Sequence, residues 1–420
     1  MKNFKFYMTS NVGGGGGTVS RLLKYLPEFN NLGSRNIGLL LNYNYLTFYE
    51  KEGLRKTKRT VFDREYLKLL NFEKIDFYDF FNLYNTDQKL SSKNINQFEV
   101  LLDTGSGKIL ADSILYYDLD IKQSRDLIFD LVEHNLLFAT EKKSTYVIAM
   151  DFCYKNTYKN DEGRSKQYKK IIFKLSKDMK LQNDLLLKSL SFLSNINNNK
   201  KPKLLAPIHG DDELNFINHY ESIIELENKS GLKFHGFALG GLNKFRHKYG
   251  KQIGKIVKRI RDLGEDRHIH ILGSAGINKI IPLLYSGANS FDCHTPWRRA
   301  NENYEISMPL FSNTSQFCKF QDNVFKNISV NKLNISKFSC DCDICNNYNI
   351  KKLKNFIDNK DSNIENFHLS KILIYLHSIY QYDFIIENYK KNRTNPSWYL
   401  ESINNEQLKK GLIESLDFIL

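Results

Sequence analysis

Three aspartates stand at the ends of short apolar segments, in positions where a side chain can do chemistry. Asp103 ends the segment FEVLLD, Asp151 follows TYVIAM, and Asp292 ends NSFD. A carboxylate that follows a buried strand can bind a metal ion or act in catalysis, or it can cap the next helix. Three such aspartates in one chain favour a catalytic or metal-binding group over three separate helix caps.

Two other segments carry groups that could hold a ligand. The segment FALGGL contains Gly240 and Gly241, whose backbone N–H groups could bind a ligand carbonyl, although a tight turn would also explain them. Arg298 and Arg299 follow Asp292 closely and could hold phosphates, or they could lie in a solvated turn. Both segments stay candidates on the sequence alone.

A cluster of cysteines indicates a metal site. Three of the six cysteines form the motif Cys340-Asp-Cys342-Asp-Ile-Cys345. In a cytosolic chain such a cluster predicts metal binding before it predicts disulfides. Three thiolates need a fourth ligand for tetrahedral zinc, and His368 is the first candidate, with His377 competing on the same expected helix. The alternative is three unrelated free cysteines.

The spacing of apolar segments predicts the elements that position these residues. From about residue 98, short apolar runs end in polar or glycine residues and are followed by helix-length patterns. The expected strands lie in residues 98–107, 145–153, 202–210, 234–241, 268–276 and 289–296. Two of the expected helices cover residues 212–226 and 244–263, where apolar residues recur at helical spacing. Strand and helix alternating in this way indicate parallel βαβ units.

Two parallel architectures fit this alternation, a doubly wound sheet and a (β/α)₈ barrel. A doubly wound sheet would carry a glycine-rich phosphate loop after its first strand, whereas a barrel spreads functional residues over many strand ends. The polar strand ends therefore favour the barrel. Residues 1–90 look irregular, and the run of glycines at 13–17, with no Gly-Lys-Ser/Thr after it, is interpreted as a mobile loop.

Composition limits the class of protein and suggests its partner. The chain has 420 residues, a formal charge of +14 and 41% hydrophobic residues, which suffices for a large core. Its pI of about 9.2 suggests a polyanionic partner, although an AT-rich genome would also encode such a composition. No apolar run reaches the length of about 18 residues that a membrane span needs. The N-terminus lacks the apolar core of a signal peptide, so we expect a cytoplasmic protein without a membrane partner.

The motifs together resemble the tRNA-guanine transglycosylase superfamily. The shared motifs follow the order of that family: Asp103-Thr-Gly-Ser-Gly107, Met150-Asp-Phe-Cys153, Gly240-Gly241-Leu242, Phe291-Asp-Cys293 with Pro296 and Arg298, and the three cysteines with His368. They cover about residues 98–380. The resemblance implies a (β/α)₈ TIM-type barrel with a small zinc-binding subdomain. It divides the chain into a divergent N-terminal region of the barrel domain (1–90), a catalytic (β/α)₈ barrel core (91–310), and a zinc-binding subdomain with C-terminal helices (311–420).

The resemblance also implies the reaction and the roles of its residues. The expected reaction exchanges guanine in a polynucleotide for a free 7-deazaguanine base, without cutting the strand. Asp292 would be the nucleophile that forms a covalent glycosyl-enzyme, and Asp103 the general acid/base. Asp151 would bind the base through its carboxylate, and Gly240, Gly241 and Leu242 through the backbone. The target base must leave its stack to be reached, and a zinc with four protein ligands would be structural.

Departures from the family pattern point to a particular branch. His209 stands where the family has the glutamine that helps to bind the base, and Trp297 follows Pro296 in place of the family's threonine. With these changes, and with no further RNA-binding domain expected after the zinc site, the sequence resembles the DpdA-type branch of bacteria and phages. That branch inserts 7-deazaguanines into DNA. The expected partner is therefore DNA, in the host cytoplasm if the chain is phage-encoded.

Two other functions stay open at this point. One is a queuine-type enzyme that acts on tRNA, and the other is a non-catalytic, zinc-stabilised nucleic-acid-binding paralogue. Retention of both Asp103 and Asp292 speaks against the paralogue, because two neighbouring carboxylates are costly to keep ionised. Basic stretches at 51–59, 164–180 and 244–261 fit either nucleic acid, or they are solvated helix faces. A homodimer is a further expectation, because bacterial relatives dimerise near the zinc subdomain.

Overall fold

The structure is a computed structural model of the chain. It describes residues 4–10, 35–42, 98–106, 110, 119–141, 143–152, 166–196, 201–242, 250–274, 279–303, 305–306, 318–319, 328–329, 339–340, 342–348, 350–359, 364–401 and 406–417. The glycine run at 13–17 and the basic stretch at 51–59 lie outside these residues, so the expectations for them stay untested.

Eight parallel strands close into a barrel, as the strand-end pattern predicts. The strands are β1 (Lys5–Ser10), β2 (Ile37–Asn42), β3 (Val100–Asp103), β4 (Tyr146–Ile148), β5 (Lys203–Ile208), β6 (Gly236–Leu239), β7 (His268–Ile271) and β8 (Ser290–Asp292). Each strand pairs with the next, and β8 pairs with β1 to close the ring. Because all strands run the same way, their carboxyl ends meet at one rim of the barrel.

The barrel wall separates two apolar clusters. Side chains alternate along a strand, so every second residue faces the barrel interior and the others face the helices. The interior cluster consists of six residues from six strands, namely Tyr7, Leu40, Leu101, Ile148, Leu205 and Ala238. The large cluster between strands and helices includes Phe6, Leu39 and Phe237. The interior is therefore packed with side chains rather than open as a channel.

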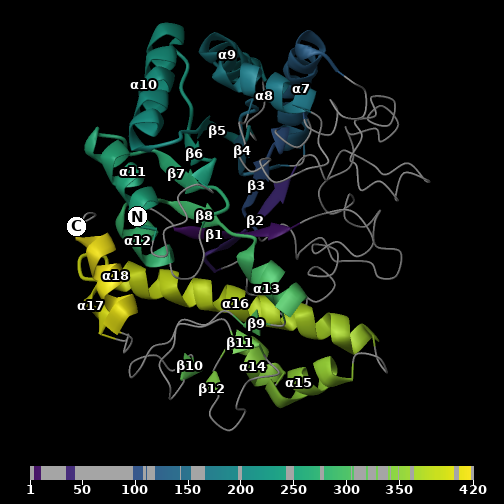
Figure 1. The fold of residues 1–420 in the computed structure, drawn as a ribbon, viewed down its shortest axis with the longest axis vertical. Coiled ribbons are helices and arrows are strands. Elements are labelled where there is room, and N and C mark those ends of the chain that lie inside the picture. The colour runs from purple at the N-terminus through teal and green to yellow at the C-terminus, as the bar shows by residue number, and fades with distance from the viewer. Residues whose placement is uncertain are drawn as a thin grey trace.

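Helices surround the barrel and follow its strands in the sequence (Figure 1). They are α7 (Ile121–Glu141), α8 (Lys166–Lys177), α9 (Met179–Asn195), α10 (Glu213–Ser230), α11 (Lys251–Asp262) and α12 (Ile280–Tyr285). Asp212 caps α10 by accepting the Asn215 N–H at 2.8 Å, and Gly231 ends the helix with a φ of 72°. These ends fix where the chain returns to the sheet. None of the helices in the described ranges is long and apolar enough to cross a membrane.

A long helix separates the barrel from a small C-terminal subdomain. Helix α16 (Ile364–Lys391) runs beneath the barrel in Figure 1, with α13 (Thr295–Asn303) on one side of it. On its other side lie α14 (Asp343–Asn347), α15 (Ile350–Asp358) and two small antiparallel sheets. These sheets pair β9 (Glu305–Ile306) with β11 (Ile328–Ser329), and β10 (Cys318–Lys319) with β12 (Ser339–Cys340). The chain then forms α17 (Ser397–Leu400) and α18 (Glu406–Leu416), which packs on α11 and α12.

The strands and helices expected from the sequence are found, but two strands were missed. All six expected segments contain a barrel strand, and α10 and α11 match the two expected helices. Strands β1 and β2 lie within residues 1–90, which the sequence pattern suggested were irregular. The expectation was wrong because strand–helix alternation was the signal used, and it was recognised only from about residue 98 onwards.

Candidate functional site

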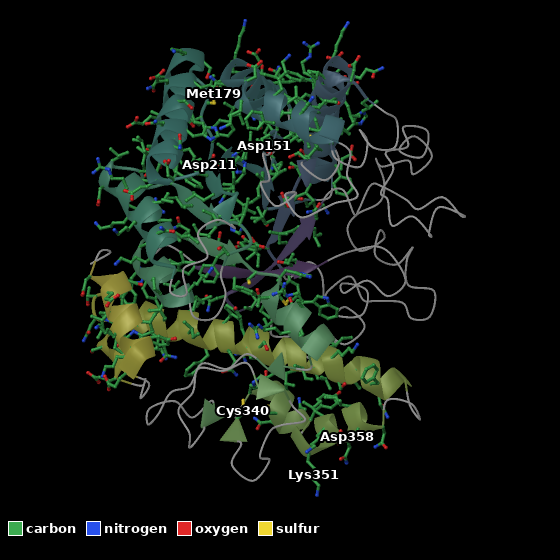
Figure 2. All side chains as sticks on the ribbon, in the orientation of Figure 1. Asp151, Met179, Asp211, Cys340, Lys351 and Asp358 are labelled. Carbon is green, nitrogen blue, oxygen red and sulfur yellow. The ribbon has the colours of Figure 1, made fainter. Side chains whose placement is uncertain are left out.

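The predicted site residues lie where the barrel strands end. Asp103 and Asp292 are the last residues of β3 and β8. Asp151 and His209 follow β4 and β5, and the glycine pair follows β6. The carboxyl ends of parallel barrel strands converge, and this rim is where barrel enzymes bind their substrates. Figure 2 marks Asp151 within the barrel, on the opposite side of α16 from Cys340.

Asp151 is a buried carboxylate held by two side chains from neighbouring strand ends. It is 8% exposed. The Ser106 hydroxyl donates to its Oδ1 at 2.8 Å, and His209 Nε2 contacts its Oδ2 as an ion pair. Its oxygens therefore bind groups of the site and do not cap a helix. The structure thus brings together Asp151 and His209, which the sequence analysis selected separately.

The surroundings of Asp151 keep it ionised. Burial alone would raise the pKa of this carboxyl, but the charge of His209 and the hydrogen bonds from His209 and Ser106 hold its pKa below the ordinary value. The backbone N–H of His209 donates to His219 Nδ1 at 3.1 Å. Burial and the nearby His209 lower the pKa of His219 to about 4, so His219 stays neutral at physiological pH and keeps that acceptor.

The ring of His209 lies directly against Gly240. A Cβ at position 240 would lie 2.4 Å from His209 Cε1 and 2.8 Å from its Nδ1. Such distances are shorter than van der Waals contact allows, so a Cβ at this position would have to displace the ring. The next residue, Gly241, has a φ of 72°, a conformation that favours glycine. The local geometry therefore favours glycine at both positions, and Leu242 after them is buried.

Asp292 is held by three donors from three parts of the barrel rim. It is 5% exposed. Its Oδ1 accepts the Gly273 N–H at 2.8 Å and lies 3.2 Å from His270 Nε2. Its Oδ2 accepts the Thr9 hydroxyl at 3.2 Å. These contacts supply hydrogen-bond partners to both oxygens of the buried carboxylate.

Asp103 is tied to the adjacent strand. Asn42, the last residue of β2, donates through Nδ2 to Asp103 Oδ2 at 2.9 Å. The Gly105 N–H lies 3.4 Å from Asp103 Oδ1. Asp103 is partly exposed, in contrast to Asp151 and Asp292. This carboxylate is therefore fixed in orientation while it stays accessible.

Helix α13 carries the predicted phosphate-binding arginines. Arg298 is exposed and Arg299 is half-buried. Trp297 is buried and packs edge-on against Tyr375 of α16, with ring centroids 5.4 Å apart. The tryptophan thus anchors α13 to α16, and the arginines stand on the anchored helix.

The cysteines converge with one histidine into a four-residue cluster. Cys340, Cys342, Cys345 and His377 offer ligand atoms that all lie within 4.8 Å of one another. His377 Nδ1 is 3.3 Å from the sulfurs of Cys342 and Cys345 and 3.8 Å from that of Cys340. Tetrahedral zinc, with bonds of about 2.0–2.3 Å, separates its ligand atoms by roughly 3.5–3.8 Å, so the residues fit such an ion.

The fourth member of the cluster corrects the sequence prediction. His368 was the first candidate, but His377 occupies the position next to the cysteines. Both belong to α16, and position 368 lies nine residues earlier, about 13 Å along the helix axis and on its opposite side. Helix α15 lies between the cysteines and α16 in the sequence, so chain spacing alone could not select the turn of α16 that faces the sulfurs.

Crowding of the thiols also favours a cation at this cluster. Hydrogen bonds to the sulfurs of Cys340 and Cys342, together with burial, raise the pKa of the Cys345 thiol far above its ordinary value. Three such thiols can ionise together only when a positive charge balances them. The donor set is therefore one that a soft divalent ion would complete.

Several residues of the site were not selected from the sequence. They are Thr9, Asn42, Ser106, His270 and Ser290. Thr9 and Asn42 lie at the ends of β1 and β2 and carry the same strand-end signal as the aspartates. His270 and Ser290 could have been found from the polar alternation of HIHI and of NSFD, because alternate residues of a barrel strand face its interior.

The barrel, the buried carboxylates at its rim and the cysteine–histidine cluster define the class of protein. The model of the family described as queuine tRNA-ribosyltransferase matches residues 155–392, which is more than half of the chain. The chain therefore belongs to this family, within the tRNA-guanine transglycosylase superfamily. The family comprises pentosyltransferases of the guanine transglycosylase type.

Proposed function

We propose that the protein is a DNA-guanine transglycosylase that exchanges guanine in DNA for a free 7-deazaguanine such as 7-cyano-7-deazaguanine. Asp292 attacks the anomeric carbon of a deoxyguanosine while the bond from that carbon to guanine N9 breaks. Asp103 protonates the departing guanine and later removes the proton from the incoming base. That base then attacks the same carbon and releases Asp292.

The observation that carries the proposal is the different environment of each carboxylate. Asp292 is buried and accepts hydrogen bonds from N–H and hydroxyl donors, which suits a carboxylate nucleophile that must be held in orientation. Asp103 is partly exposed and bonded to the Asn42 amide, which suits a group that gains and loses a proton. Two carboxylates of one barrel rim with separate environments are typical of glycosyl substitution with retained configuration.

Asp151 is the residue that we assign to base recognition. An ionised carboxylate can accept hydrogen bonds from both N1–H and the exocyclic amine of guanine. The lowered pKa of Asp151 supports this role, because a protonated acid would lose one acceptor. His209 contacts Asp151 from the neighbouring strand end, and Gly240, Gly241 and Leu242, which follow β6 beside the His209 ring, would offer backbone groups to the base.

The preference for DNA rests on the segments that depart from the family pattern. His209 replaces the glutamine of the tRNA enzymes and engages Asp151 directly. Trp297 replaces a threonine of the family's Pro-Thr-Arg motif and packs against α16. Both changes fall in segments that would contact the base or the polynucleotide. The tRNA reaction is the second candidate, because the matching family model is described as queuine tRNA-ribosyltransferase.

Basic side chains on α8 support a polynucleotide partner. Lys170, Lys174 and Lys177 are exposed on this helix, and Phe173 beside them is 48% exposed. Lys177 Nζ lies 5.8 Å from the centre of the Phe173 ring. Cationic side chains with an exposed aromatic ring suit phosphates and an unstacked base.

The metal that we infer for the Cys340 cluster is a structural zinc, since four protein ligands leave no position for water.

A paired exchange assay tests the proposal. Purified protein is incubated with labelled 7-cyano-7-deazaguanine and either guanine-containing DNA or bulk tRNA, followed by nucleoside mass spectrometry. We expect label in deoxynucleosides with wild type and none with Asp292→Asn, which keeps the shape of the side chain but loses its charge. Label confined to ribonucleosides would assign the tRNA reaction, and a fully active Asp292→Asn would overturn the mechanism.

A further inference from the structure

A line of polar side chains runs through the barrel interior towards Asp292. His268 and His270 are alternate residues of β7, and Ser290 and Asp292 are alternate residues of β8, so all four face inward. His270 and Ser290 are register partners across the two strands. The six residues of the interior apolar cluster come from β1 to β6. The polar line therefore lies in the part of the barrel interior next to β7 and β8.

Consecutive members of this line are within hydrogen-bond distance. His268 Nε2 lies 2.7 Å from Ser290 Oγ, and that same oxygen lies 2.8 Å from His270 Nδ1. His270 Nε2 lies 3.2 Å from Asp292 Oδ1. His270 and Ser290 are both 0% exposed, so no bulk water competes for these contacts.

The chemistry of the end groups gives the line one direction. An ionised Asp292 only accepts, so His270 must carry its proton on Nε2. In the tautomer with its single proton on Nε2, His270 has an unprotonated Nδ1, which accepts the Ser290 hydroxyl proton. The serine oxygen in turn accepts the N–H of His268. Every hydrogen bond therefore points towards the carboxylate, and Ser290 fixes the tautomer of His270.

The neighbouring strands leave room for the two imidazoles. Gly236 and Ala238 of β6 are the register partners of His268 and His270. A Cβ at Gly236 would lie 2.1 Å from the backbone oxygen of His268. Tyr7 approaches His270 edge-on, with ring centroids 5.6 Å apart. Small residues on one side and a ring on the other hold the His270 plane in place.

The charged and aromatic side chains around this line of residues interact with one another. Tyr7 donates its hydroxyl to Glu99 at 3.2 Å, and burial with the Glu99 charge raises the pKa of Tyr7 well above its usual value. Lys5 in turn lies 3.6 Å from Glu99. Tyr146 stacks on His268 at 4.6 Å, and Lys203 lies over the Tyr146 ring. The charged groups nearby are thus partnered with one another or with aromatic rings.

We propose that His270 is a positioning residue for the Asp292 nucleophile, and that Ser290 and His268 act through it by fixing its tautomer. This inference rests on the proposed function. His270 and the Gly273 N–H both bind Oδ1, whereas the described donor to Oδ2 is the Thr9 hydroxyl. Oδ2 is therefore the attacking oxygen. Its electron pair forms the bond to the anomeric carbon as the electrons of the bond to guanine N9 leave with the base.

The two N–H donors also assist the second half of the exchange. In the glycosyl-enzyme, Oδ1 is the carbonyl oxygen of the ester. When the incoming base attacks, the bond between Oδ2 and the anomeric carbon breaks and the negative charge returns to the carboxylate. Donors already aimed at Oδ1 stabilise that charge without reorganisation. The role of His270 is therefore exerted on Asp292 and needs no contact with the substrate.

Four variants of the full-length protein test this role in single-turnover formation of the covalent adduct. We expect His270→Phe to slow adduct formation by about 100-fold, the scale for loss of one preorganised donor, with little change in substrate affinity. His270→Gln, whose Nε2 can still donate, should recover most of the rate. Ser290→Ala should cost about tenfold, because the tautomer is no longer fixed. Ser189→Ala, a buried serine of α9, is the matched control.

A second measurement does not depend on activity. In protein labelled with ¹⁵N-histidine, we expect His270 to show a protonated Nε2 and an unprotonated Nδ1. The substitution Asp292→Asn should shift the Nε2 signal of His270, and Ser290→Ala should shift the Nδ1 signal of His270. A wild-type protein without adduct would overturn the proposed function, while unmoved His270 signals would overturn this inference whatever the assay gives. An active wild type with an unimpaired His270→Phe would also overturn it.

Discussion

The partner of each carboxylate determines what that carboxylate can do. Asp151 faces His209 and a serine hydroxyl, whereas Asp292 faces a backbone N–H, a threonine hydroxyl and a buried imidazole. Both oxygens of Asp151 are engaged by these side chains, whereas the described donor to Asp292 Oδ2 is the Thr9 hydroxyl, which leaves that oxygen the more available to react. The two aspartates therefore suit recognition and attack, respectively.

The pair of histidines beside Asp151 should make the stability of the protein pH-dependent. Because burial lowers the pKa of His219 to about 4, the unfolded chain binds more protons at this residue between about pH 6.5 and pH 4. Stability should therefore fall as the pH decreases through that window, by on the order of 3 kcal/mol from this residue. His219→Asn keeps an acceptor for the His209 N–H but does not titrate. Urea unfolding from pH 7 to pH 4 should show a flatter decline in this variant.

The matched control for this effect is a histidine outside the site. His134 lies exposed on α7, so His134→Asn should leave the decline unchanged. If His219→Asn follows the wild-type curve throughout the window, then His219 does not titrate as its surroundings indicate.

Among the elements, β5 and β6 meet closely where Gly240, after β6, packs against His209, after β5. The His209 ring covers Gly240 so closely that a methyl group there would meet Cε1 at 2.4 Å. We expect Gly240→Ala to displace the ring, weaken its pairing with Asp151 and reduce affinity for free guanine by about tenfold. The measurement is calorimetric titration of guanine, with thermal unfolding as a check that the barrel persists.

A double variant separates the clash from other effects of the methyl group. In His209→Ala the obstructing ring is absent, so adding Gly240→Ala should cost nothing further. If the two substitutions instead add independently, the ring and the glycine do not act as a unit, and the explanation of Gly240 is wrong.

Element prediction succeeded where the chain alternates and failed where it does not. Strands β3 to β8 are separated by helical patterns or short links, so their spacing revealed the barrel. Strand β2 has the buried pattern of a central strand, but 57 residues lie between Asn42 and Val100 without a helical pattern that was recognised. The strand-end rule, once applied to β1 and β2, finds Thr9 and Asn42 as well.

At the scale of the whole molecule, one arginine joins the barrel to the metal cluster. Arg35, just before β2, pairs with Asp383 of α16 at 3.1 Å and with Asp343 of α14 at 3.4 Å. Its guanidinium also lies 4.8 Å from the centre of the Tyr380 ring. Helix α16 therefore contacts the barrel on one side and the cysteine cluster on the other. Loss of the metal cluster should therefore also lower the stability of the barrel.

The site as a whole was only partly predictable, because contacts across the barrel leave no trace in linear spacing. The aspartates, His209 and the cysteines follow from strand ends and motif spacing. His270 and Ser290 matter only because β7 and β8 are neighbours in register, and His377 only because α16 crosses the subdomain where it does. Such residues become visible once the order of the strands and the path of the helix are known.

The identity of the fourth ligand gives the sharpest test at this scale. His377 faces the three sulfurs, whereas position 368 lies about 13 Å away along α16, so of the two histidine variants we expect only His377→Ala to lose the metal. Purified wild type should carry about one zinc per chain, and His377→Ala and Cys342→Ser well below half of that, by elemental analysis. Both variants should unfold at a lower temperature, because metal binding contributes to folding. His368→Ala, on the same helix, should keep its zinc and its stability. Retention of zinc by His377→Ala together with its loss from His368→Ala would restore the ligand set expected from the sequence.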